Sequence, residues 1–206
     1  MADTKTQLYL ASKSPRRRQL LEQMGVNFAQ INVDVLEDRL HQEKPQDYVS
    51  RIALEKARAG SRVTNLDKSI PILGADTIVV IDNQILGKPA DFNDAIGVLT
   101  QLSGRTHKVL TAISVIHDKA WSSISETAVS FRDLSDSEIE AYCFSNEPWD
   151  KAGGYAIQGK AAIFVKEIKG SYSGVMGLPI FETAQCLQNT GLQILGTNDI
   201  NMEIYE

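Results

Sequence analysis

One segment constrains the fold of this chain more than any other. The stretch SIPILGADTIVVID, residues 69–82, is strongly apolar except for one carboxylate near its middle, Asp76. A run this rich in apolar and β-branched residues predicts a buried strand, and Asp82-Asn83 at its end predicts a hairpin turn into QILG. Aspartate is disfavoured in strands and costly to bury, so Asp76 is the first candidate functional residue.

Predicted strands and helices alternate along the rest of the chain. The strands are expected at 8–12, 26–33, 107–117, 121–134 and 161–170, and the helices at 15–24, 45–60, 90–104, 135–145 and 178–191. The first three elements form a β-α-β start, whereas 107–117 and 121–134 predict a long antiparallel pair. Because β-α units are combined with hairpins, we expect an α/β fold with a mixed sheet.

Composition and charge exclude several classes of function. The 206 residues suit a single domain over 1–206, and the net charge of −5 should repel nucleic acid and anionic membranes. The polar start MADTKTQ and the lack of any run of about 20 apolar residues predict neither a signal peptide nor a membrane helix. Cys143 and Cys186 form no CxxC pair, which is typical of reduced thiols in a cytoplasmic protein.

Three consecutive arginines follow the expected helix cap, Ser14. Cations are unfavourable at a helix N-terminus. At roughly 100° per residue, Arg17 falls on the apolar face of the helix, Arg16 at its edge and Arg18 toward solvent. One interpretation pairs Arg17 with an internal carboxylate. We favour the other, a phosphate site made of Ser12, Ser14, the helix N-terminus, Arg16 and Arg17, because one anionic ligand explains both unfavourable placements.

The carboxylates allow two interpretations. Asp76 is either held by loop amides or by Arg17, or it is a metal ligand or general base. Asp34, Glu37 and Asp38 lie in an acidic loop that is expected to be solvated when taken alone. Together with Asp76, this loop could hold a hard divalent cation, which prefers oxygen ligands and bridges phosphates.

Two lysines add weaker signals. Lys56 lies on the predicted helix 45–60 and Lys88 in the turn LGKPAD. Such lysines are usually solvated, but both are suited to binding phosphate as point charges. Arg105 and His107 are expected to be structural, and no zinc, Ser-His-Asp or Walker pattern is present in the sequence.

The stretch DKAGGYAIQG, residues 150–159, predicts a loop whose glycines permit close backbone approach. Gln158 offers an amide donor beside an acceptor, which can match two adjacent positions on a uracil or thymine edge. A glutamate there would only accept, which would suit guanine. The alternative is a tight turn in which the Gln158 side chain bonds to backbone.

Seven stretches together resemble one family. They are LASKSPRR (10–17), EKARA (55–59), GADTIVV (74–80), LGKPAD (86–91), LSGRTHKVLTA (102–112), DKAGGYAIQG (150–159) and GSYSGVMGLPIFET (170–183). In this order and spacing, over about residues 7 to 190, the chain resembles the Maf family. That family was first described as septum-formation inhibitors and then as nucleoside triphosphate pyrophosphatases.

The resemblance implies a fold and a reaction. The fold is an elongated mixed sheet flanked by helices, with two lobes around a central cleft, similar to inosine triphosphate pyrophosphatases. The reaction splits the bond between the α- and β-phosphates of a nucleotide. The form AGxYxIQG resembles the branch of the family that acts on dTTP and UTP. A homodimer is also implied.

The resemblance also assigns roles to residues. The catalytic carboxylate falls on Asp76, and the acidic metal position falls in the 34–38 loop, where we place it at Glu37. These two would share a divalent cation, Mg²⁺ or Mn²⁺. The implied phosphate-binding positions are Ser12, Arg16, Arg17, Lys56 and Lys88, and those that distinguish the branches are Arg16, Thr77 and Gln158.

Two other functions remain open at this point. The same pocket could belong to a nucleotide-binding regulator of cell division without significant turnover, although a pure binder of polyanions gains nothing from a buried Asp76. A hydrolase that releases orthophosphate is a third candidate, and the absent Walker motif argues against its common forms.

Overall fold

The computed structural model describes residues 6–145 and 147–194, so the outermost parts of the predicted 1–206 domain lie outside the described residues. One mixed sheet has the strand order β2-β1-β3-β5-β6-β7, with β4 paired to β3. Its strands are β1 (Leu8–Leu10), β2 (Phe28–Gln30), β3 (Ile72–Ile81), β4 (Gln84–Leu86), β5 (Thr106–Ile116), β6 (Ala120–Phe131) and β7 (Val165–Lys169). The β1–β2 and β1–β3 pairs are parallel and the others antiparallel, which confirms the predicted mixed sheet.

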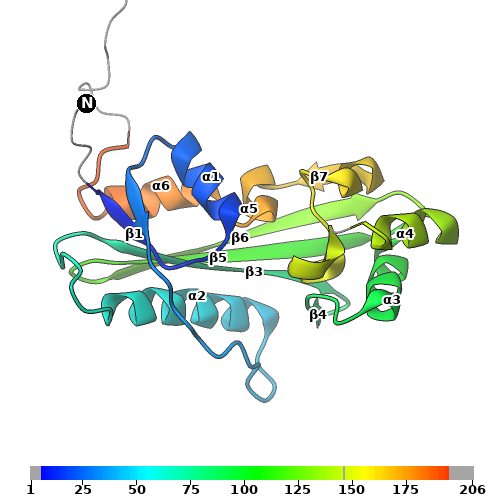
Figure 1. The fold of residues 1–206 in the computed structure, drawn as a ribbon, viewed down its shortest axis with the longest axis horizontal. Coiled ribbons are helices and arrows are strands. Elements are labelled where there is room, and N and C mark those ends of the chain that lie inside the picture. The colour runs from blue at the N-terminus through cyan, green and yellow to red at the C-terminus, as the bar shows by residue number, and fades with distance from the viewer. Residues whose placement is uncertain (1–5, 146, 195–206) are drawn as a thin grey trace, which may run out of the picture.

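Helices cover both faces of the sheet (Figure 1). They are α1 (Pro15–Gln23), α2 (Pro45–Ser61), α3 (Phe92–Leu102), α4 (Asp136–Cys143), α5 (Tyr172–Met176) and α6 (Ile180–Gln188). Helix α2 packs on one face of β3 and β5, where Val49 and Ile52 meet Ile78 and Leu110. On the opposite face, α1 and α6 pack on the same two strands. No helix within the described ranges is both long and apolar enough to cross a membrane.

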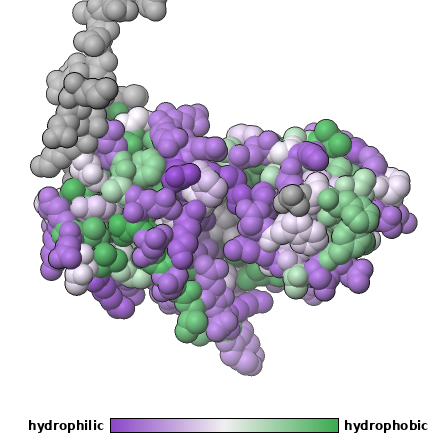
Figure 2. Space-filling view, viewed as in Figure 1, coloured by the Kyte–Doolittle hydropathy of each residue, from purple (hydrophilic) through white to green (hydrophobic). Residues whose placement is uncertain are grey.

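The pairing of β3 leaves a gap on one edge. Strand β1 pairs with β3 only at Ile72 and Leu73, and β4 begins to pair only at Val79. The stretch between these two pairings carries Asp76 and Thr77, and a cleft opens there. Figure 2 shows a hollow between a larger and a smaller part of the molecule, with hydrophilic residues gathered along it.

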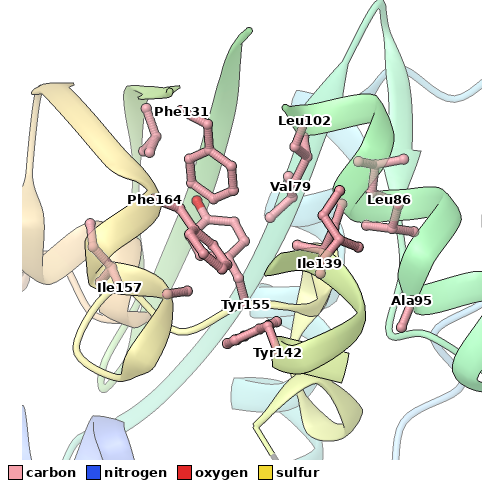
Figure 3. Packing of buried hydrophobic residues seen from close by; sticks show 14 of the residues in the cluster. Val79, Leu86, Ala95, Leu102, Phe131, Ile139, Tyr142, Tyr155, Ile157 and Phe164 are labelled. Atoms are coloured by element: carbon pink, nitrogen blue, oxygen red, sulfur yellow. The ribbon is translucent and has the colours of Figure 1, made fainter. Parts of the chain in front are cut away.

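A packed cluster fills the end of the sheet beyond the cleft (Figure 3). Phe131, Tyr155 and Phe164 stack edge to face, with ring centroids 4.9 Å and 6.0 Å from Phe131. His107 is 2% exposed, and its Nε2 lies 2.7 Å from the Tyr155 hydroxyl, so the predicted structural role of His107 is confirmed. Because Tyr155 belongs to the glycine-rich loop, this cluster anchors one wall of the cleft to the sheet.

The structure corrects the sequence predictions in three places. The predicted strand 161–170 is wrong in its first half, because Lys160–Phe164 forms a 3-10 helix and only Val165–Lys169 is a strand. Helix α5 was not expected, since its five residues are too few to show a helical period. The expected strand 26–33 narrows to Phe28–Gln30. Both cysteines are free, as predicted, and both are buried.

Candidate functional site

The cleft has a volume of about 500 Å³. The residues predicted to be catalytic, metal-binding, phosphate-binding or base-selecting all line it: Ser12, Ser14, Arg16, Arg17, Glu37, Lys56, Asp76, Thr77, Lys88 and Gln158. Of the other two candidates in the acidic loop, Asp34 lines the cleft and Asp38 does not. Its lining carries six Lys or Arg side chains and four Asp or Glu side chains, a formal charge of +2. The whole chain has a net charge of −5, so positive charge is concentrated at the cleft.

One wall is the loop before α1. Ser14 caps the helix as predicted, because its Oγ accepts a hydrogen bond from the Arg17 backbone N–H at 3.5 Å. Ser12 is 8% exposed, and its Oγ accepts from the Ser14 N–H at 3.3 Å. Pro15 occupies the first turn, where a missing N–H costs nothing. The wall therefore presents serine hydroxyls and the start of a helix to the cleft.

Arg17 points inward, as the helical period predicted, and is 9% exposed. Its guanidinium donates to three neutral oxygens: Nε to Gly177 O at 2.8 Å, Nη1 to Ser12 Oγ at 3.0 Å and Nη2 to Thr77 Oγ1 at 3.1 Å. The alternative in which Arg17 pairs with a carboxylate is wrong for the described residues, since no acidic oxygen there lies within 4.0 Å. Burial lowers the pKa of Arg17, while the nearby charge of Asp76 opposes that shift.

Arg16 and Arg18 differ as expected. Arg18 is exposed. Arg16 has a side chain that is 25% exposed, and its Nη1 lies 3.7 Å from Asp150 Oδ2. Asp150 belongs to the short 3-10 helix Pro148–Asp150 on the far wall, so this ion pair joins the two walls. No pattern in the sequence pointed to this contact, because the two residues lie on distant segments.

Asp76 is held by a lysine from the helix that covers β3. A Cβ on Gly74 would lie 2.4 Å from both Ala53 O and Ala57 N, so only glycine lets α2 approach this closely. The close packing brings Lys56 Nζ to 2.8 Å from Asp76 Oδ1. The alternative that Asp76 pairs with Arg17 is therefore replaced by a pair with Lys56.

Glu37 completes a group of three charges. Lys56 Nζ lies 2.7 Å from Glu37 Oε1, so one ammonium bridges two carboxylates. Asp34 pairs with Lys13 at 3.1 Å instead, and Asp38 is not among the residues that line the cleft. Of the acidic loop, Glu37 is thus the residue that shares a cation with Asp76.

The protonation of these carboxylates follows from their surroundings. Burial raises the pKa of Asp76 above its usual value, although the charges of Lys56 and Arg17 oppose the shift. Burial also disfavours ionised Glu37, but the hydrogen bond from Lys56 and the charges of Lys56 and Lys88 outweigh it and lower the pKa of Glu37. The pKa values of the two carboxylates are therefore shifted in opposite directions, an arrangement typical of acid-base chemistry.

The point between these carboxylates could hold a divalent cation. Lys56 shows that positive charge is favoured there, and Mg²⁺ commonly uses one or two carboxylates together with substrate phosphates. No group of three or more His, Cys, Asp or Glu suited to a metal occurs in 6–145 or 147–194. The donor set thus fits a cation that is shared with a phosphate ligand.

Three remaining candidates complete the cleft. Lys88 is exposed and makes no ion pair or hydrogen bond with the part of the chain that the structure describes. Thr77 Oγ1 lies 3.0 Å from Thr111 Oγ1, which ties it to the sheet. Gln158 is exposed, and its side chain has no hydrogen-bond partner among the described residues, so the alternative in which it bonds to backbone is not what the structure shows.

Comparisons with known proteins agree with one another. The family model described as Maf-like protein matches residues 7–190. A dTTP/UTP pyrophosphatase of Alkalilimnicola ehrlichii is 51% identical over 183 residues, covering 87% of this chain and 91% of its own. One of Pseudoalteromonas translucida is 53% identical over 182 residues, covering 88% and 95%. One of Escherichia coli strain K12 is 48% identical over 185 residues, covering 89% and 93%.

Solved structures are more distant. A nucleoside-triphosphatase, or dITP/XTP pyrophosphatase, from Mycobacterium abscessus matches at 18% identity with a TM-score of 0.41, covering 62% of this chain and 74% of that one.

Proposed function

The chain belongs to the Maf-like protein family, whose model matches residues 7–190, and from that premise we propose that it is a nucleoside triphosphate pyrophosphatase. It hydrolyses the bond between the α- and β-phosphates and releases a nucleoside monophosphate and pyrophosphate. Its substrates are dTTP and UTP, which are the substrates in the names of the relatives at 48–53% identity.

One observation carries the proposal: a buried carboxylate lies in a cleft whose walls are otherwise rich in cations. Asp76 is 6% exposed, and Arg16, Arg17, Lys56 and Lys88 line the same cleft. A site that only binds a polyanion is weakened by a carboxylate beside it. A site that activates water beside a phosphate has a use for one, because a carboxylate can act as the general base.

The phosphates are held by the α1 wall and the lysines. The start of α1 and the serine hydroxyls favour phosphate oxygens. Arg17 uses three N–H groups on neutral oxygens, and no carboxylate oxygen of the described residues lies within 4.0 Å of it, so its charge attracts the phosphates. Lys88 is free to reach the same chain of phosphates.

Asp76 acts as the general base. It lies in the cleft beside the phosphate-binding cations, and a positioned carboxylate there can accept the proton of an attacking water. The oxygen of a water molecule attacks the α-phosphorus, and the bond from that phosphorus to the bridging oxygen breaks. The proton of the water passes to Asp76, and pyrophosphate leaves with the bridging oxygen. Glu37, with its lowered pKa, stays ionised.

A divalent cation, Mg²⁺ or Mn²⁺, would be held by Asp76 and Glu37 in place of the Lys56 ammonium. Such a cation polarises phosphoryl oxygens and neutralises the charge that develops on them. Gln158 selects the base, since its amide donor and acceptor match adjacent acceptor and donor positions of thymine or uracil.

The test uses water labelled with ¹⁸O. Purified protein is incubated with dTTP, and the products are separated and analysed by mass spectrometry. Attack on the α-phosphorus puts the label in dTMP and leaves pyrophosphate unlabelled. Orthophosphate as the first product would overturn the proposed reaction. Binding of dTTP without any product would favour the regulator of cell division.

A further inference from the structure

The loop that carries Gln158 is buried up to that residue and reaches the surface at Gln158. Residues 153–157 are buried, and Gln158 is exposed toward the cleft. Tyr155 and Ile157 belong to the packed cluster of Figure 3. Gln158 therefore stands at the tip of a turn, closed by the Gly159 N–H donating to Ala156 O at 3.0 Å. The direction of its side chain depends on how this turn is held.

The far side of the turn is held by one carboxylate, Glu147. Its Oε2 accepts from the Lys160 backbone N–H at 2.8 Å, and its Oε1 accepts from the Ala161 N–H at 3.2 Å. The Tyr142 hydroxyl donates to the same Oε1 at 2.9 Å. These backbone N–H groups belong to the first residues of the 3-10 helix that directly follows Gln158 and Gly159.

Gly159 shows how closely this carboxylate approaches the turn. A Cβ on Gly159 would lie 2.3 Å from Glu147 Oε2 and 2.5 Å from Oε1. The φ of Gly159 is −109°, which any residue adopts, so glycine serves space here and not backbone freedom: a larger residue would push the Glu147 carboxylate away from the turn. Burial disfavours the charge of Glu147, yet the backbone and Tyr142 hydrogen bonds outweigh it and lower the pKa of Glu147.

We propose that Glu147 is the positioning residue for base selection: by clamping the turn at Gly159 and the two residues after it, Glu147 fixes Gln158 where it meets the base. Glu147 itself is absent from the residues that line the cleft. The inference rests on the proposed function, because base selection has meaning only for a nucleotide substrate.

The variants separate positioning from stability. Glu147→Ala removes all three hydrogen bonds that the carboxylate accepts. Glu147→Gln keeps the size and shape of the side chain, but its amide N–H₂ faces one backbone N–H that then has no acceptor. Glu138→Gln is the matched control, since Glu138 also caps a helix, accepting from the Ser135 N–H at 3.0 Å, and lies outside the cleft lining. Each variant is also combined with Gln158→Ala in a double-mutant cycle.

The measurement is kcat and KM for pyrophosphate release from dTTP, UTP, dGTP and dATP. We expect Glu147→Ala to raise KM for dTTP and UTP at least tenfold and to lower their preference over the purines by the same factor. Glu147→Gln should show a smaller effect in the same direction. In the Gln158→Ala background, Glu147→Ala should change the preference less than twofold, because the amide that it positions is already gone. Glu138→Gln should lower thermal stability and leave the preference unchanged.

Three results would overturn the inference. They are an unchanged preference in folded Glu147→Ala, an additive effect with Gln158→Ala, or a shift of equal size in Glu138→Gln. If Glu147→Ala does not fold, the same criteria apply to Glu147→Gln.

If wild-type protein binds an α,β-methylene analogue of dTTP but releases no pyrophosphate from dTTP, the proposed function fails. In that case the double-mutant cycle of Glu147 and Gln158 is evaluated with Kd values for that analogue and for its purine counterpart. If neither analogue binds, both proposals are overturned.

Discussion

Replacing Asp76 with asparagine should move activity and stability in opposite directions. The substitution keeps the size of the side chain and an oxygen that can accept from Lys56, but it removes the charge and the base. A positioned general base contributes about 10²- to 10⁴-fold to a rate, so kcat/KM should fall by at least that factor, about 2.7 to 5.4 kcal/mol of transition-state stabilisation.

Stability should rise at neutral pH. Burial raises the pKa of Asp76 in the folded chain above its usual value of 3.8, despite the opposing charges of Lys56 and Arg17. The ionised carboxylate therefore destabilises the fold above its folded pKa, and this penalty vanishes below pH 3.8. The neutral amide of the Asp76→Asn variant carries no such penalty. The variant should unfold at a higher temperature than wild type at pH 7. This difference in melting temperature should shrink to zero as the pH falls below the pKa of Asp76 in the unfolded chain.

The assay pairs steady-state kinetics with thermal unfolding across pH 3.5 to 8. Asp47→Asn, at an exposed position in the first turn of α2, is the control and should change neither readout strongly. A folded Asp76→Asn protein that keeps kcat/KM within tenfold of wild type would refute the role of Asp76 as the base. A variant less stable than wild type at pH 7 would refute the burial penalty, since Asp76 would then be a structural partner of Lys56.

The same geometry makes three further predictions. Gln158→Glu should lower kcat/KM for dTTP and UTP about ten- to hundredfold, because a carboxylate cannot donate to a base, while melting temperature stays the same for this exposed residue. Lys88→Met should raise KM about tenfold or more at low salt, and less at high salt, with no loss of stability, whereas Lys166→Met on exposed β7 should have no effect. Burial lowers the pKa of His107 from 6.5 to about 4, so the neutral ring favours the folded state above pH 6.5. The contribution of His107 to the free energy of unfolding should fall by about 3 kcal/mol as the pH drops toward 4. Urea unfolding of His107→Gln should therefore show a smaller loss of stability between pH 7 and 4.5 than wild type, and an equal loss would contradict the buried neutral ring.

The sequence predicted those parts of the fold that rest on periodicity. Strand β3 follows from a long apolar run, and the strands β5 and β6, the helix α2 and the inward direction of Arg17 follow from patterns that extend over many residues. The 3-10 helix Lys160–Phe164 could not be predicted in this way. It begins where the distant carboxylate of Glu147 accepts two backbone N–H groups, which is a tertiary effect that overrides local preference.

The candidate site divides along the same line. Residue type and local context singled out Asp76, because a carboxylate in an apolar strand is costly wherever the strand lies. The partners of these residues were not predictable, because Lys56 reaches Asp76 only through the close packing of α2 on Gly74. Likewise, Arg17 donates to the carbonyl oxygen of Gly177, which lies 160 residues away in the sequence. Loop residues such as Asp150 carry no periodic signal, so their place opposite Arg16 emerges only from the assembled fold.

The most direct test of the proposed function is a substrate panel. Purified protein is incubated with Mg²⁺ or Mn²⁺ and each common nucleoside triphosphate in turn, and pyrophosphate and orthophosphate are quantified separately. We expect pyrophosphate from dTTP and UTP, little from purine nucleotides, and no orthophosphate beyond background. Pyrophosphate from a guanine nucleotide in preference to dTTP would contradict the role of Gln158, and the absence of pyrophosphate from every nucleotide would contradict the proposed enzyme itself.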